Sequence, residues 1–283
     1  MASMNGRVCV VTGATHGVGL ATAHALAALG ATVLVHGRDL ARARAVAADI
    51  TRQTGNTELR AVQADFAHLA QVRRLGEELD ATLPRLDVLI NNAGMMSGVR
   101  ARSADGYELT FAVNHLAPFL LTNLLLGKLK SSAPARVIVV ASEAHRRARL
   151  DFADLMNASV SGLLPAYARS KLANVLFTRA LAARLAGSGV TVNALHPGFV
   201  SSNLFHRSRM LRIVLGTLVR PFMLSPQQGA RTSVYLATAP ELTGHSGGYY
   251  RDRRLVAPSL AAQSDGDASR LWQESALLTG LPP

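Results

Sequence analysis

Val8-Cys9-Val10-Val11-Thr12-Gly13-Ala14-Thr15-His16-Gly17-Val18-Gly19 opens with an apolar run and ends in a glycine-rich turn. The apolar run predicts a buried strand, and the alanine- and leucine-rich stretch 20–29 predicts a helix directly after the turn. Glycines let the backbone bend sharply and approach a pyrophosphate, towards which the new helix points its free N–H groups. The stretch therefore indicates the start of a dinucleotide-binding unit, with a glycine-rich turn that holds no ligand as the alternative.

Apolar runs typical of strands alternate with longer stretches typical of helices along the rest of the chain. Further strands are expected over 31–36, 59–64, 86–91, 136–141, 190–195 and 247–251. Helices are expected over 40–54, 69–83, 106–130, 166–186 and 229–237, and the tail from Ser259 onward predicts a loop and a final helix. No linker, repeat or low-complexity tract interrupts this alternation. We therefore expect an α/β fold in one domain spanning 1–283, a Rossmann-type doubly wound parallel sheet of about seven strands.

The composition limits the class of protein. With 283 residues, of which 49% are hydrophobic, the chain can form one large domain with a substantial core. Its single cysteine, Cys9, lies in the first predicted strand, so we expect no disulfides and a reducing, cytoplasmic location. Residues 1–7 do not resemble a signal peptide, and no apolar run reaches the roughly 18 residues that a membrane-spanning helix needs.

The charge is strongly positive, at +12 with histidine neutral, and comes mostly from arginines dispersed through alanine-rich segments. A basic chain is typical of nucleic-acid binding, but neither a helix-turn-helix pattern nor a basic motif interleaved with aromatic residues is present. We therefore expect no nucleic-acid partner. The charge favours an anionic cofactor or an anionic membrane surface instead.

Several motifs follow one another in a fixed order. They are Thr12-Gly13-x-x-x-Gly17-x-Gly19, Asp65, Asn91-Asn92-Ala93-Gly94, Asn114, Ser142, Tyr167-x-x-x-Lys171 and Pro197-Gly198. In this order they resemble the short-chain dehydrogenase/reductase family, and the resemblance covers nearly the whole chain. The three residues between the first two glycines agree with it, because the extended epimerase relatives usually carry two. The segments 142–145, 195–198, 226–230 and 246–250 further resemble the retinol dehydrogenase-like branch.

The tyrosine and the lysine fit the chemistry of carbonyl reduction, which places a hydride on carbon and a proton on oxygen. Tyr167 and Lys171 are four residues apart, so on a helix they share one face. The proton donor must lie within hydrogen-bond reach of the substrate oxygen. We expect the nearby ammonium to lower the pKa of Tyr167 from its usual value of about 10 towards the working pH.

The resemblance implies roles for the other polar residues of the catalytic set. It implies that Lys171 also binds the nicotinamide ribose, that Ser142 hydrogen-bonds the substrate oxygen, and that Asn114 holds a water that links the lysine to solvent. Two alternatives stay open. Asn114 can instead bond backbone groups inside its helix, and Ser142 can bond its own loop.

The resemblance also implies which residues bind the cofactor. Asp65 is expected to meet the adenine, and Val200 is expected to lie near the nicotinamide carboxamide. No residue is assigned to a metal. The complete set expected at the cofactor is Gly13, Thr15, His16, Gly17, Val18, Gly19, Arg38, Asp65, Asn92, Ala93, Gly94, Tyr167, Lys171, Pro197, Gly198 and Val200.

The residues after the second predicted strand indicate NADP(H) as the preferred cofactor, with NAD(H) as the alternative. NAD-preferring relatives usually carry an acid where this chain has Gly37, and the next residue is Arg38. An arginine can bind a 2′-phosphate through two parallel charge-assisted hydrogen bonds. Asp39 leaves two alternatives open, because it can pair with Arg38 or cap the next helix. His16 is neutral to mildly favourable for NADP.

Residues 201–226 are expected to form a lid over the substrate, as loops at this place do in the family. Their apolar side chains, with Arg209, Arg212 and Arg220 on one narrow arc, predict a basic amphipathic element. Contact with an anionic membrane and packing on a partner subunit are the alternatives. The branch implies a lipophilic aldehyde, ketone or alcohol as substrate, and the family implies a homodimer or a homotetramer.

Two classes of function fit these observations. The first is an NADP(H)-dependent oxidoreductase that interconverts a carbonyl and an alcohol on a lipophilic small molecule, with Tyr167 as acid and base. The second is a catalytically silent NADP(H)-binding sensor or a scaffold protein. Because such sensors usually lose the tyrosine or the lysine, and both are present here, the sequence favours the enzyme.

Overall fold

The computed structural model describes residues 2–97, 99–156, 163–200 and 223–282 of the chain. Within these residues the strands form an eight-stranded sheet in the order β3-β2-β1-β4-β5-β6-β7-β8. Neighbouring strands are parallel from β3 to β7, and β8 pairs antiparallel with β7. The strands are β1 (Val8–Val11), β2 (Thr32–Gly37), β3 (Leu59–Gln63), β4 (Val88–Asn91), β5 (Ala135–Val140), β6 (Val190–His196), β7 (Tyr249–Arg251) and β8 (Arg254–Leu255).

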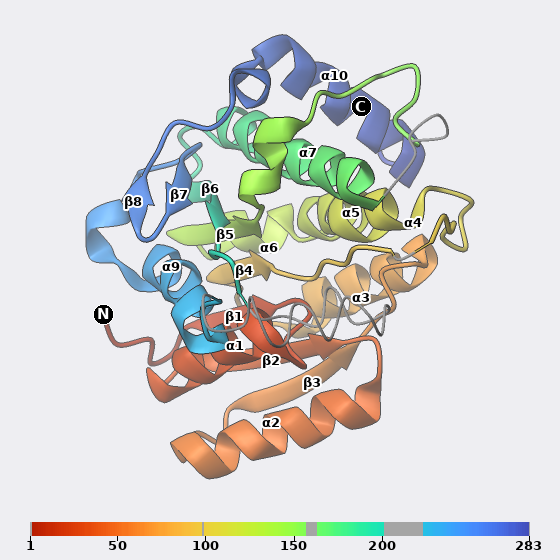
Figure 1. Cartoon of the computed structure of the whole chain (residues 1–283). Coiled ribbons are helices and arrows are strands. Elements are labelled where there is room, and N and C mark those ends of the chain that lie inside the picture. Colours follow the sequence, from red (N-terminus) through yellow and green to blue (C-terminus); the bar gives the residue numbers. More distant parts are fainter. Residues whose placement is uncertain (1, 98, 157–162, 201–222, 283) are drawn as a thin grey trace.

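Helices cover both faces of the sheet (Figure 1). One face carries α1, α2 and α9, and the other carries α3, α5 and α7, with α10 packed against α7. None of the helices that the structure describes combines the length and the apolarity needed to cross a membrane. The helices are α1 (Gly17–Ala28), α2 (Leu40–Thr54), α3 (Leu69–Thr82), α4 (Leu109–Phe111), the π-helix η1 (Ala112–Leu116), α5 (Ala117–Leu124), α6 (Leu126–Ser131), the 3₁₀ helix η2 (Glu143–Arg147), α7 (Leu163–Arg184), α9 (Pro226–Thr238), the 3₁₀ helices η6 (Pro240–Leu242) and η7 (Leu260–Gln263), and α10 (Asp265–Thr279).

Burial on both faces explains why the central strands are almost continuously apolar. On β1 and β4, Val10 and Leu89 face the core beneath α3, α5 and α7. Their neighbours Val11 and Ile90 face the core beneath α1, α2 and α9. Strands of a doubly covered parallel sheet have no solvated face to carry polar residues. The predicted Rossmann-type doubly wound sheet is therefore confirmed.

The sheet has one strand more than the sequence predicts. After β7 the chain turns back through Asp252 and Arg253, whose φ angles are +48° and +62°. The turn places Arg254 opposite Arg251 and creates the short antiparallel strand β8. Left-handed backbone usually shows itself in a sequence through glycine or asparagine. The aspartate gives only a weak signal of this kind and the arginine gives none, which is why the hairpin was not predicted.

The single long helix expected over 106–130 is also corrected. Gly106 has a φ of +84° and lies in a turn. The first helical residue is Leu109, because the Glu108 carboxylate accepts hydrogen bonds from the backbone N–H groups of Thr110 and Phe111, at 2.9 and 2.7 Å. Beyond it the segment passes through the π-helix η1 and is divided at Leu125 into α5 and α6.

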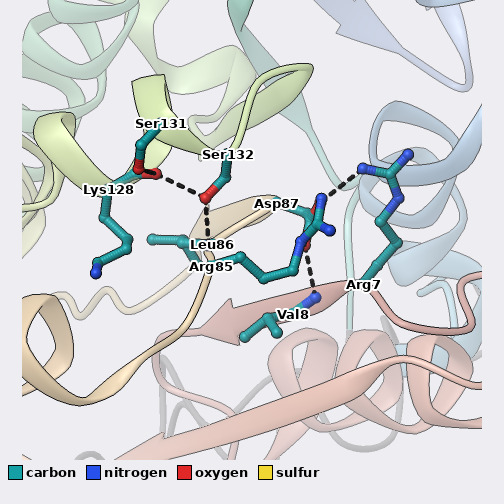
Figure 2. Close-up of polar contacts among 8 residues, drawn as sticks. All are labelled: Arg7, Val8, Arg85, Leu86, Asp87, Lys128, Ser131 and Ser132. Atoms are coloured by element: carbon teal, nitrogen blue, oxygen red, sulfur yellow. Dashed lines mark hydrogen bonds and ion pairs between the residues drawn. The ribbon is translucent and has the colours of Figure 1, made fainter.

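A buried carboxylate joins β1 and β4 at the amino-terminal edge of the sheet (Figure 2). Asp87, only 2% exposed, accepts hydrogen bonds from Arg7 Nη1 at 2.6 Å and from the Val8 backbone N–H at 2.8 Å. Arg85 adds bonds from Nε at 2.8 Å and from Nη2 at 2.6 Å. These contacts hold the starts of the two central strands together, at the edge opposite to the motifs singled out from the sequence.

The strand order places a topological switch between β1 and β4. The chain adds β2 and β3 on one side of β1 and then crosses to β4 on its other side. In open α/β sheets, ligands bind at such a point, outside the carboxyl ends of the strands. The glycine-rich turn follows β1, and the Asn-Asn-Ala-Gly motif follows β4.

Candidate active site

The glycine-rich turn fits an anionic dinucleotide group. Gly13 and Gly17 have φ angles of +62° and +57°, a conformation that favours glycine. Helix α1 begins at Gly17, and no side chain caps its amino terminus: His16 occupies the cap position without a side-chain hydrogen bond. No acidic residue lies in the first turn either. The backbone N–H groups of this turn, with the positive end of the helix dipole, can therefore bind a pyrophosphate.

The Asn-Asn-Ala-Gly motif fastens this turn. Thr12 Oγ1 accepts hydrogen bonds from the backbone N–H groups of Asn92 and Ala93, both at 2.9 Å. Asn92 Nδ2 donates in return to the carbonyl oxygens of Thr12 and Gly13, at 2.8 and 3.2 Å. A Cβ on Gly19 would lie 2.3 Å from Asn92 Nδ2, so this close approach requires glycine. The glycine-rich turn and the Asn-Asn-Ala-Gly motif are thus joined by hydrogen bonds at the switch point.

The expected catalytic side chains come together beside these two motifs. Ser142 follows β5, and Tyr167 and Lys171 lie on one face of α7. The Ser142 hydroxyl lies near enough to the Tyr167 phenol to favour its anion. Lys171 Nζ donates at 2.9 Å to the Val140 carbonyl oxygen and lies 5.6 Å from the centre of the Tyr167 ring. A Cβ on Gly94 would lie 3.3 Å from Lys171 Nζ, so Gly94 borders the same site.

Burial sets the protonation of this pair. It lowers the pKa of Lys171, which is 3% exposed, to about 8. It also raises the pKa of Tyr167, and the Ser142 hydroxyl opposes that rise. The expected lowering of the tyrosine pKa is therefore wrong for this structure, because the desolvation of the phenol outweighs the groups that stabilise its anion.

Asn114 lies in the π-helix η1, an element that is frequent at functional sites. Its Nδ2 donates at 2.9 Å to both the Met95 carbonyl oxygen and Ser170 Oγ, and its Oδ1 accepts from the Met95 N–H at 2.8 Å. The side chain thus bonds backbone, as in the alternative, but the backbone of the segment after β4 rather than of its own helix. Its role in holding a water stays a prediction.

Ser142 lies beside Tyr167 and also bonds its own loop, as the alternative reading proposed. Its Oγ accepts from the Ala144 backbone N–H at 3.2 Å and so caps the 3₁₀ helix η2. A residue that the sequence analysis missed holds it from the other side. His145, fully buried, bonds the Ser142 carbonyl oxygen through Nδ1 at 2.7 Å and accepts from the Ser259 N–H through Nε2 at 3.1 Å.

Two arginines lie near the expected 2′-phosphate position. Asp39 caps α2 by accepting the Arg42 backbone N–H at 2.9 Å, so the capping alternative is confirmed. Arg38 is exposed and forms no ion pair with Asp39. Burial lowers the pKa of His16, and the charges of Arg42 and Arg38 lower it further. Arg42 was missed, although an arginine in the first turn of the helix that follows β2 was a readable signal.

The Asp65 side chain shapes the loop after β3. Its Oδ1 accepts from the Ala67 backbone N–H at 3.0 Å, and its own N–H donates to Gln71 Oε1 at 2.9 Å. The structure places this residue beyond the carboxyl end of β3, beside the end of β2. Its contact with adenine stays a prediction.

Helix α9 brings the Pro197–Gly198 segment against the glycine turn. A Cβ on Gly229 would lie 2.5 Å from Val200 Cγ2 and 3.1 Å from Val18 Cγ2. It would also lie 3.3 Å from the Pro197 carbonyl oxygen, so the absence of a side chain on Gly229 lets these three groups meet. Residues 201–222 of the expected lid lie outside the described residues. Pro226, at the end of the expected lid, is the first residue of α9 and follows a Ser225 capping box, and the lid itself stays a prediction.

Comparison with known proteins agrees with this geometry. A model of the short chain dehydrogenase family matches residues 7–211. The chain belongs to this family. Retinol dehydrogenase 14 from Homo sapiens is 42% identical over 294 residues, which cover 98% of this chain and 88% of that protein. Dehydrogenase/reductase SDR family member 13 from Bos taurus is 45% identical over 287 residues, which cover 100% of this chain and 76% of that protein.

Solved structures of the family superpose on this short-chain dehydrogenase. An uncharacterised protein from Mycobacterium paratuberculosis matches with a TM-score of 0.81 and 34% identity, over 99% of this chain and 96% of its own. The NADP complex of RhlG from Pseudomonas aeruginosa matches with a TM-score of 0.69 and 27% identity, over 87% and 94%. The chain is therefore a retinol dehydrogenase-like oxidoreductase of carbonyl and alcohol groups, from a family that uses NAD(P)(H).

Proposed function

We propose that this enzyme uses NADP(H) to interconvert a carbonyl and an alcohol on a lipophilic small molecule, with Tyr167 as the acid and base. The observation that carries the proposal is that the side chains of Ser142, Tyr167 and Lys171 lie together at one site. The Ser142 hydroxyl lies near enough to the Tyr167 phenol to lower its pKa, and the lysine ammonium lies over the tyrosine ring. Two hydroxyls so close together can both bond one substrate oxygen.

In the proposed reduction, Tyr167 gives its proton to the substrate oxygen while the substrate carbon gains a hydride. When bound, the nicotinamide supplies that hydride or, in the reverse direction, accepts it. Ser142 holds the oxygen through a hydrogen bond. Lys171 carries positive charge below its pKa of about 8 and so favours the tyrosinate that remains after the transfer. The raised pKa of Tyr167 supports this direction, because the phenol keeps its proton at neutral pH.

The preference for NADP(H) rests on the end of β2. Gly37 offers no carboxylate for a ribose 2′-hydroxyl, and a Cβ there would lie 2.6 Å from Thr15 Cγ2. Because Asp39 is engaged at the amino terminus of α2, the Arg38 guanidinium is available to a 2′-phosphate. Arg42 adds a second positive charge at the same helix end, where anions are already favoured.

The lipophilic substrate class rests on the relatives and on apolar residues near the site. Retinol dehydrogenase 14 is named for a lipophilic alcohol. Phe199 and Leu224 are 50% and 37% exposed, and the Leu224 N–H donates at 2.8 Å to the Phe199 carbonyl oxygen. They follow Pro197–Gly198 and precede α9, so they adjoin the nicotinamide end of the expected site. A cytoplasmic location and a homodimeric or homotetrameric assembly stay predictions of the sequence.

A substrate panel tests the proposal. The purified protein is mixed with NADPH or NADH and with small polar or bulky apolar aldehydes and ketones, and nucleotide oxidation is followed by absorbance. We expect turnover with NADPH and the bulky apolar carbonyls. Higher kcat/KM on the small polar compounds would exclude the lipophilic class. Tight NADPH binding without turnover on any compound would favour a sensor.

A further inference from the structure

His36 is a buried histidine at the carboxyl end of β2, only 3% exposed, and the reaction outlined above does not use it. Its ring lies between the ends of three neighbouring strands. Nδ1 accepts a hydrogen bond from the Gly13 backbone N–H at 3.1 Å, and Nε2 lies 3.1 Å from the Ala64 carbonyl oxygen. On one side the ring packs on Phe66, with 4.5 Å between the ring centres.

These two contacts determine the form of the imidazole. A carbonyl oxygen can only accept, so Nε2 must carry the proton that bonds Ala64. A backbone N–H can only donate, so Nδ1 must offer its lone pair to Gly13. The neutral Nε2–H tautomer is the one form that satisfies both partners. Burial agrees with it, since it lowers the pKa of His36 to about 4.

The groups that His36 holds belong to the expected cofactor site. Gly13 opens the glycine-rich turn, and the His36 carbonyl oxygen accepts the next N–H of that turn, from Ala14, at 2.8 Å. Ala64 directly precedes Asp65, and Arg38 follows His36 by two residues. One side chain therefore ties together the turn for the pyrophosphate, the segment for the 2′-phosphate and the loop expected at the adenine.

The glycine turn is held from both sides. Asn92 bonds the carbonyl oxygens of Thr12 and Gly13 from the side of β4, and His36 bonds the Gly13 N–H from the side of β2. A Cβ on Gly13 would lie 2.8 Å from Ala93 Cα, so the turn has little room to move towards β4. Removing the imidazole acceptor would leave a backbone donor of the turn unpaired and free to reorient.

We propose that His36 is a positioning residue for the adenosine and pyrophosphate half of the cofactor, acting through the Gly13 N–H. The inference rests on the proposed function, because it takes NADP(H) as the ligand of this turn. His36 does not touch the reacting atoms. Its loss should weaken cofactor binding and leave the chemical step unchanged once the cofactor is bound.

Three substitutions separate the two hydrogen bonds of the ring. In His36→Asn, the side-chain oxygen is as many bonds from Cβ as Nδ1 is in histidine. This variant can therefore still accept the hydrogen bond from the Gly13 N–H. In His36→Gln, the side-chain amide nitrogen is as many bonds from Cβ as Nε2 is in histidine. This variant can therefore still donate a hydrogen bond to the Ala64 carbonyl oxygen. His36→Phe keeps the ring on Phe66 and removes both bonds.

Titration calorimetry with NADPH and with adenosine 2′,5′-bisphosphate measures the effect. We expect His36→Phe and His36→Gln to raise both dissociation constants at least tenfold, and His36→Asn to stay within about threefold of the wild type. At saturating NADPH, kcat should stay within about twofold in all three variants. The matched control is Asp87→Asn, which disturbs a buried polar network at the opposite edge of the sheet and should leave both dissociation constants unchanged.

Unchanged dissociation constants in His36→Phe would overturn the inference. So would equal losses in the Asn and Gln variants, which would reduce His36 to a general packing residue. Should His36→Phe not fold, the Asn and Gln pair decides alone. A wild-type protein that binds neither NADPH nor NADH would instead refute the proposed function, so the two failures are distinguishable.

Discussion

Lys171 Nζ donates a hydrogen bond of 2.9 Å to the carbonyl oxygen of Val140, the last residue of β5. The same strand end leads within two residues to Ser142, whose hydroxyl lies near the Tyr167 phenol. The lysine on α7 and the serine after β5 therefore share one anchor. This bond ties α7 to the end of β5 beside Tyr167.

Tyr167→Phe is the direct test of the acid. The substitution removes the phenolic proton and leaves the ring to pack, so kcat should fall by about 10² or more while the variant still binds NADPH. Tyr107→Phe is the matched control, because its hydroxyl bonds the Leu278 carbonyl oxygen near the end of α10. Steady-state kinetics with a good substrate measures both. Near-wild-type turnover in Tyr167→Phe would mean that the proton comes from another group.

Ser142→Ala should separate substrate orientation from cofactor binding. The hydroxyl is expected to bond the substrate oxygen, so kcat/KM should fall about tenfold or more, with NADPH affinity close to that of the wild type. The substitution also removes the cap of η2, so its melting temperature should be recorded with the kinetics. A loss of stability with unchanged kcat/KM would leave Ser142 a capping residue only.

Arg38→Ala should remove most of the cofactor preference. The wild type should bind NADPH at least tenfold more tightly than NADH, a difference of about 1.4 kcal/mol, and the variant should bind the two nearly equally. Arg44→Ala, which removes an exposed arginine from the helix α2 that follows Arg38, provides the control. Fluorescence titration of the three proteins with both nucleotides gives one affinity ratio for each protein. Equal affinities in the wild type would remove the argument for NADP(H).

Asp87→Asn should lower stability without lowering activity. It replaces a buried carboxylate bonded to two arginines by a neutral amide that cannot accept all of those bonds. Because both arginines are about 40% exposed and can regain water, we expect a loss of about 2 kcal/mol in the free energy of unfolding. Urea unfolding measures it. A loss below about 0.5 kcal/mol would show that the network is solvated in solution.

Stability should fall in mild acid because several histidines have a lowered pKa, among them the buried His36 and His115. Burial lowers the pKa of His36 to about 4 and that of His115 to about 3. In the unfolded chain each regains an ordinary value near 6.5, so the unfolded state binds protons first as the pH falls. The free energy of unfolding should therefore drop from about pH 6.5 downwards, by up to about 1.4 kcal/mol per pH unit for each histidine. Urea unfolding from pH 7 to pH 4 should show a shallower slope in His36→Asn and in His115→Asn, and parallel curves would contradict the assignment.

Most strands of the sheet could be predicted from the sequence because the inner strands are buried on both faces. Runs such as Val8–Val11 must be apolar throughout, so their pattern is easy to read. The catalytic geometry follows from that order, because residues at the ends of parallel strands meet at one edge. Tyr167 and Lys171 come together because residues four apart share a helix face.

The remaining features depend on contacts between distant segments. His36 looks like one more residue of a strand until the fold brings Gly13 and Ala64 to its ring. The direction of the Tyr167 pKa shift depends on how deeply α7 buries the phenol, which spacing alone does not reveal. Asp87 shows the same limit, since its arginine partner Arg7 is eighty positions away.

The short hairpin after β7 has a consequence for crowded solutions. An exposed edge strand with a long row of unpaired backbone groups is a template on which another chain can add a strand, and such addition begins aggregation. Here that edge is only β8, two exposed residues long, with Arg254 as one of them. A neighbouring molecule finds too few backbone groups for a stable ladder and meets positive charge on approach. This edge therefore offers little backbone on which the sheet could grow, so a sheet continued from one molecule into the next would have to use the opposite edge, at β3.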